Sequence, residues 1–132
     1  MKRRRRLACV AAFAVLAATL VDDATAPSAI KHPRPFFVLA LAGMIAVALL
    51  AFAPRIRSEV IALGAGVAAG GALATLVSGL AWAGGVPDPL VAGGVAFNLA
   101  DLAIAAGDAL LVIGVCAHAW ANRADLSRPV VP

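Results

Sequence analysis

Residues 60–84 read VIALGAGVAAGGALATLVSGLAWAG, a long run without a single charged side chain. A helix that spans a bilayer needs about 17–25 predominantly apolar residues, so this run predicts a transmembrane helix. Within it, residues 66–70 match the GxxxG pattern, in which small side chains let two helix backbones approach closely. We therefore expect another helix to pack closely against this one.

The rest of the chain repeats this apolar character. Of its 132 residues, 63% are hydrophobic and 14% charged, whereas soluble domains carry about 25% charged residues. We therefore predict an all-α membrane bundle that forms one domain, residues 1–132, with little or no outer β-sheet. Its four helices are expected at about 7–21, 36–53, 60–84 and 96–120, followed by a short tail over 122–132.

The connections are predicted to be irregular. Residues 24–35 contain three prolines and are expected to form an outer loop, and Pro54 is expected to close the second helix. Residues 84–95 are rich in glycine and proline, which predicts turns and a mobile hairpin or half-turn. The two cysteines, Cys9 and Cys116, lie in apolar surroundings and are expected to be small core residues.

Lysine and arginine set the predicted topology, because they favour the cytoplasmic side of short loops. With a cytoplasmic N-terminus, nine of the eleven basic residues lie inside, and only Lys31 and Arg34 lie outside. We therefore place both termini on the cytoplasmic side of a cell membrane. The net charge of +4 then reflects a topological anchor, and nucleic acid is not an expected partner. Cleavage of the first run as a signal peptide stays an alternative, since residues 24–26 match an A-x-A site.

This topology gathers polar residues on the outer side. An Asp inside a span disfavours insertion by roughly 2.5–3.5 kcal/mol at mid-membrane, so such a residue is a functional-site hypothesis. The outer helix ends and loops hold Asp22, Asp23, Asp88, Asn98 and Asp101. Spacing places Asp108 on the same face of the last helix as Asn98 and Asp101, a face we expect to look inward. Asp108 is interpreted either as a second acid or as a structural Asp satisfied by Ser78, Thr75 or a backbone carbonyl.

One stretch of the last helix carries a family resemblance. Its residues Phe97, Asn98, Ala100, Asp101, Ile104 and Gly107 match every fixed position of the motif Phe-Asn-x-Ala-Asp-x-x-Ile-x-x-Gly. In this the chain resembles the lipoprotein signal peptidases, or signal peptidase II. These are four-helix membrane aspartic proteases that cut lipoprotein precursors ahead of the lipid-modified cysteine. The resemblance implies an aspartic endopeptidase with no cofactor, whose partners are membrane lipid and a lipid-modified prolipoprotein.

Elsewhere the chain departs from the family pattern. Residues 70–73 match the Gly-Gly-Ala-Leu of the family's third helix, but Thr75 and Ser78 stand where the family has Asn and Asp. The resemblance implies an acid pair drawn from the third and fourth helices, with Asp101 as the retained member and Ser78 in place of the other. A serine hydroxyl orients water but does not take its proton, so we expect catalysis to be impaired.

Several functions stay open. The missing acid has three possible replacements, Asp88, Asp22 and Asp108, and Ser78 itself is a further candidate as a nucleophile. We favour a degenerate relative that binds lipoprotein or lipid on the same scaffold without cleaving it. An unrelated small membrane protein is the third possibility. A shared metal site is not expected, because His32 and His118 fall on opposite sides of the membrane in this topology.

Overall fold

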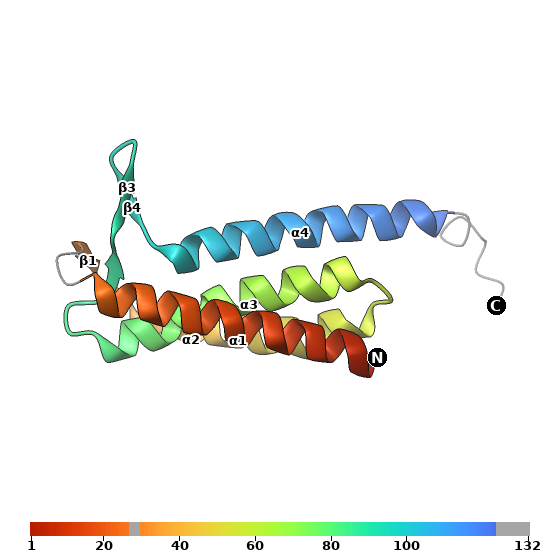
Figure 1. Ribbon diagram of the computed structural model, residues 1–132, viewed down its shortest axis with the longest axis horizontal. Helices are drawn as coiled ribbons and strands as arrows, with labels where there is room; N and C mark the ends of the chain where they lie inside the picture. Colours follow the sequence, from red (N-terminus) through yellow and green to blue (C-terminus); the bar gives the residue numbers. More distant parts are fainter. Residues whose placement is uncertain (27–29, 124–132) are drawn as a thin grey trace.

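The computed structural model describes residues 1–26 and 30–123 and shows four long helices lying side by side (Figure 1). They are α1 (Lys2–Thr25), α2 (Phe36–Phe52), α3 (Glu59–Ala81) and α4 (Leu99–Ala121). A short 3-10 turn, η1 (Ala53–Arg55), follows α2. All four helices are long and apolar enough to cross a membrane, and the chain is therefore a multi-pass membrane protein. The tail beyond residue 123 lies outside the described residues.

The third helix forms the centre of the bundle. Of its most apolar stretch 67% is buried, against 17–22% for the other three helices. Gly66 faces α1 so closely that a Cβ there would lie 2.4 Å from the Ala8 carbonyl oxygen. On the α4 side, a Cβ at Gly107 would lie 2.4 Å from the Ala68 nitrogen. These distances confirm the close approach predicted from GxxxG. Small residues make it possible, and in lipid the helices associate through van der Waals contact.

The helix ends follow local signals in the sequence. Pro54 lies in the turn that ends α2, and the Ser58 hydroxyl accepts a hydrogen bond from the Ile61 N–H (3.3 Å), which caps α3. The first helix is longer than predicted, because it begins at Lys2 and includes the basic cluster. Arg3 pairs with Glu59 at 3.1 Å, so the start of α1 and the start of α3 lie at the same end.

The opposite end carries four short strands, of which the sequence predicted only a hairpin. They are β1 (Ile30–His32), β2 (Val86–Asp88), β3 (Leu90–Ala92) and β4 (Val95–Phe97). The first two pair antiparallel, with Ile30 opposite Asp88 and His32 opposite Val86. The last two form a hairpin around Gly93 and Gly94, whose positive φ angles suit glycine. Three-residue strands escaped prediction because their pairing depends on segments that are distant in the sequence.

The cysteines do not lie in the core as predicted. Both Cys9 and Cys116 are exposed on the outer surface of the bundle. The core positions of their helices belong to Ala8 and Ala12 in α1 and to Gly107 and Gly114 in α4. A thiol is larger than these residues and points away from the tightly packed central helix.

Candidate functional site

The site begins at the N-terminus of α4, where a helix leaves backbone N–H groups without partners. The Asn98 side chain accepts a hydrogen bond from the Asp101 N–H at 3.0 Å. In return, Asp101 Oδ2 accepts one from the Asn98 N–H at 3.2 Å. These reciprocal bonds form a capping box and hold one carboxylate oxygen of Asp101 in a fixed place.

A second acid comes from β2. Asp88 is only 1% exposed, and its Oδ2 lies 2.5 Å from Nδ1 of His32. The pairing of β1 with β2 places His32 opposite Val86, so its ring reaches the diagonal neighbour Asp88. The other oxygen, Asp88 Oδ1, is buried and has no hydrogen-bond partner among the described residues. His32 therefore fixes one side of this carboxylate and leaves the other side uncommitted.

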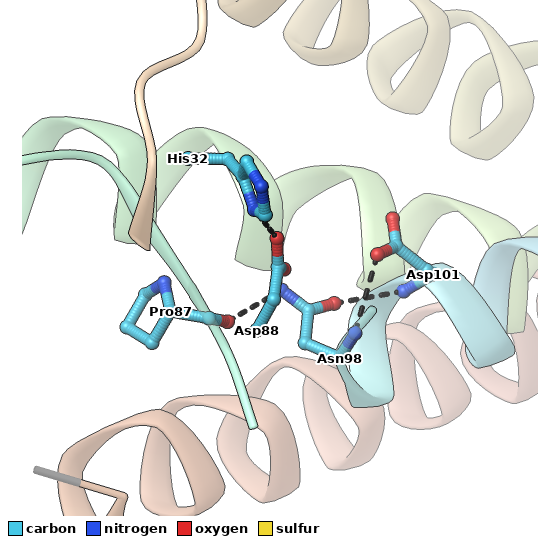
Figure 2. A network of polar contacts seen from close by, with 5 residues as sticks. All are labelled: His32, Pro87, Asp88, Asn98 and Asp101. Atoms are coloured by element: carbon cyan, nitrogen blue, oxygen red, sulfur yellow. Dashed lines mark hydrogen bonds and ion pairs between the residues drawn. The ribbon is translucent and has the colours of Figure 1, made fainter. Parts of the chain in front are cut away.

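Asn98 connects these two elements. Its side-chain nitrogen donates a hydrogen bond to the Pro87 carbonyl oxygen at 3.1 Å, and the residue is 1% exposed. Figure 2 shows Asn98 beside both Asp88 and Asp101, with His32 covering Asp88 from the far side. The buried amide thus attaches β2 to the first turn of α4. It lies between the segments that carry Asp88 and Asp101, and each of these acids has one carboxylate oxygen in a hydrogen bond.

A third acid of the same end is sealed inside the bundle. Asp23 is 2% exposed and accepts a hydrogen bond from the hydroxyl of Ser78, which is fully buried in α3. Asp23 also lies within electrostatic range of Asp88 and Asp101. The neighbouring Asp22 is only half-buried. Ser78 therefore faces α1, and the acid that meets it is Asp23 and not the fourth-helix Asp101.

The other two predicted site residues lie away from this cluster. The Thr75 hydroxyl donates to the Gly71 carbonyl oxygen of its own helix at 3.1 Å. Asp108 is exposed, so the prediction that its face of α4 looks inward is wrong at this depth. The contact with α3 is made instead by the small residues Ala100, Ala103, Gly107 and Gly114. Close packing through small residues leaves the Asp108 side chain on the outer surface.

Two participants were missed by the sequence reasoning, Asp23 and His32. A signal for Asp23 was present, since Ala8, Ala12, Thr19 and Asp23 recur at helical spacing and form the buried face of α1. Asp22 falls outside that spacing. No local signal marks His32, because its contact with Asp88 joins residues 56 positions apart.

The arrangement suits acid–base chemistry on a neutral substrate. Asp88 and Asp101 each have one carboxylate oxygen in a hydrogen bond, and the second oxygen of Asp88 is buried without a partner among the described residues. Among the described residues, no group of three or more His, Cys, Asp or Glu side chains is placed to hold a metal ion. Comparison with protein-family models, curated proteins and solved structures finds no match for this chain.

Proposed function

We propose that this chain is a membrane aspartic endopeptidase of the signal peptidase II type, acting on lipid-modified prolipoproteins with Asp88 and Asp101 as its acid pair. The observation that carries the proposal is the Asn98 side chain, which caps Asp101 and binds the backbone next to Asp88. In the motif that carries the resemblance, Asn and Asp stand three residues apart, and the capping box gives this spacing a physical reason.

The position of Asp88 revises the expectation of impaired catalysis. Ser78 does not face Asp101, because its hydroxyl donates a hydrogen bond to Asp23 on α1. We therefore do not place the second acid of the pair at position 78. Asp88 supplies the second carboxylate from the strand that follows α3. Two acids are then available beside Asn98, and the loss of an acid at position 78 leaves this pair intact.

The pair performs peptide hydrolysis by general acid–base catalysis. One carboxylate takes a proton from water as the water oxygen bonds to the peptide carbonyl carbon. The other, protonated, donates its proton to the carbonyl oxygen. When the tetrahedral intermediate collapses, the C–N bond breaks and the amine leaves with a proton returned by the first acid, while the second carboxylate takes back a proton from a hydroxyl as the C=O bond re-forms. His32 holds Asp88 and Asn98 holds Asp101. Both carboxylates are therefore positioned before the substrate binds, and the reaction does not carry the entropy cost of ordering them.

Apolar surface next to Asp101 supports a lipid-modified substrate. A groove between α1 and α4 is lined by Val15 and Ala18 on one side and by Leu99, Leu102 and Ala106 on the other. Leu102 directly follows Asp101, so the groove begins beside the acid pair. We place this end on the outer side of the cell membrane, because the basic residues 2–6 lie at the other end, where Arg4 donates to the Ile56 carbonyl oxygen in the turn that carries Arg55 and Arg57.

Complementation of a strain that lacks signal peptidase II tests the proposal. We expect the intact chain to restore processing, seen as a shift of accumulated prolipoprotein to the mature size on a gel. Processing should disappear in Asp101→Asn and in Asp88→Asn, while Asp22→Asn retains it. Membrane levels of each variant, measured by immunoblot, control for loss of folding.

The main alternative is a non-catalytic lipoprotein-binding or lipid-binding protein on the same scaffold, which the substitutions Thr75 and Ser78 in the third helix favour. Failure of the intact chain to process prolipoprotein, with normal membrane levels, would overturn the peptidase proposal. Copurification of intact prolipoprotein with the chain would then support the binding function.

A further inference from the structure

The β3–β4 hairpin stands apart from the bundle. In Figure 1 it projects across the direction of the helices, level with the last turns of α1 and α3, and it extends past α4. Its strands pair with each other, with Val91 opposite Ala96 and Ala92 opposite Val95. Its large side chains are left open, because Leu90 is 40% exposed, Val91 62% and Val95 63%.

The composition of this hairpin is that of a buried segment. Residues 89–97 read PLVAGGVAF and contain no charged or hydrogen-bonding side chain. Exposed hairpins in water normally carry polar and charged residues that prevent edge-to-edge association. A wholly apolar hairpin with open side chains therefore indicates a surface that is covered in the working protein.

Its direction identifies what covers it. Since the four helices cross the membrane, a segment that runs across them at the level of their ends lies along the membrane surface. We propose that the β3–β4 hairpin is an interfacial anchor, with Leu90 and Val95, which lie on the same face of the hairpin, inserted among the lipids of the leaflet at the strand-bearing end. Its outer strand edges keep unpaired N–H and C=O groups, which need water or headgroups and hold the hairpin at the interface.

The anchor has a consequence for the site, and this consequence rests on the proposed function. Only Pro89 separates Asp88 from β3, and Phe97 directly precedes Asn98. A hairpin fixed at the interface therefore fixes the depth of both sides of the acid pair. A scissile bond that lies next to a membrane-embedded lipid group is then presented at the height of the two carboxylates.

Depth measurements in a bilayer test the anchor independently of any activity. Cys9 and Cys116 are replaced by alanine, and a nitroxide is attached through Leu90→Cys or Val95→Cys, on the same face of the hairpin, in phosphatidylcholine–phosphatidylglycerol vesicles. We expect both labels to be relaxed more strongly by oxygen, which concentrates in lipid, than by a water-soluble nickel chelate. Lys31→Cys, on the exposed β1 strand of the same end, is the matched control and should show the opposite preference.

Two outcomes overturn the anchor. One is nickel accessibility at Leu90 and Val95 equal to that at Lys31. The other is protection of these labels only when a peptide substrate is added, which would identify the hairpin as a strand-pairing site for substrate.

A second variant relates the anchor to the acid pair. In Leu90→Glu/Val95→Glu we expect several-fold slower processing in vesicles and unchanged processing in detergent micelles, where depth is not imposed. Equal loss in both media would instead place the hairpin in the catalytic machinery and contradict its role as a depth anchor. If the hairpin of the wild type inserts into lipid but the wild type processes no prolipoprotein, the peptidase proposal is contradicted and the anchor proposal is supported.

Discussion

Asp23 and Asp101 lie at the same end of the bundle in opposite surroundings. Asp23 is 2% exposed, wedged between α1 and α3, and bonded to the buried Ser78. Asp101 is half-buried at the open first turn of α4, where the backbone and side chain of Asn98 hold it. The comparison teaches that the packing face of the helix, and not the residue type, decides whether an acid meets a substrate or stabilises the bundle.

The largest difference should appear when the two acids are changed in the same way. We expect Asp101→Asn to lower the rate of prolipoprotein processing by roughly 10²–10⁴-fold, the usual contribution of a general acid or base. Asp23→Asn should process within about twofold of the wild type, because the amide oxygen still accepts the bond from Ser78. Rates are compared in purified, lipid-reconstituted protein. If Asp23→Asn lowered the processing rate as much as Asp101→Asn, the assignment of Asp23 as structural and Asp101 as catalytic would be wrong.

His32 gives the next largest effect, since it anchors Asp88, the other acid of the proposed pair, which is 1% exposed. Replacing it with alanine frees both oxygens of Asp88, and we expect kcat to fall roughly 10–100-fold through loss of orientation, with KM little changed. His32→Asn restores a donor at the position of Nδ1 and should recover most of the rate. His118→Ala, at the far end of α4, is the control. A fall of similar size in His32→Asn would show that the ring matters for more than this hydrogen bond.

Ser78 tests the structural side of the comparison. In Ser78→Ala the Asp23 carboxylate loses its only hydrogen-bond partner in the described structure, which should cost about 1–2 kcal/mol of folding free energy. The double variant Ser78→Ala/Asp23→Ala should regain part of this loss, because no buried acid is left unpaired. Unfolding by SDS in mixed micelles measures both values. Equal stability of wild type and Ser78→Ala would show that the bond between α1 and α3 contributes nothing.

The comparison also separates what the sequence could predict from what it could not. The four apolar runs were sufficient to predict the four helices, and the GxxxG pattern was sufficient to predict the close helix approach around Gly66. The Asn98–Asp101 spacing was sufficient for one half of the site. Helical periodicity pointed to Asp23, but Asp22 was named as a possible replacement acid because it lies at the outer end of the first predicted helix. The contact between His32 and Asp88 depends on strand pairing between two loops, and no local pattern encodes that pairing.

Asp108 should give the smallest effect, and it tests whether exposure alone excludes an acid from the site. It is exposed and lies in the first half of α4, seven residues after Asp101, and the described structure shows no hydrogen bond between it and either acid of the proposed pair. In Asp108→Leu the side chain is in lipid both in the folded bundle and in the dissociated helices, so the free energy of folding should change by less than about 0.5 kcal/mol. Processing should stay within about twofold of the wild type, in reconstituted protein at matched amounts. A tenfold loss in Asp108→Leu that Asp108→Asn restores would place a polar contact of the substrate at this depth and extend the site from the first turn of α4 to its centre.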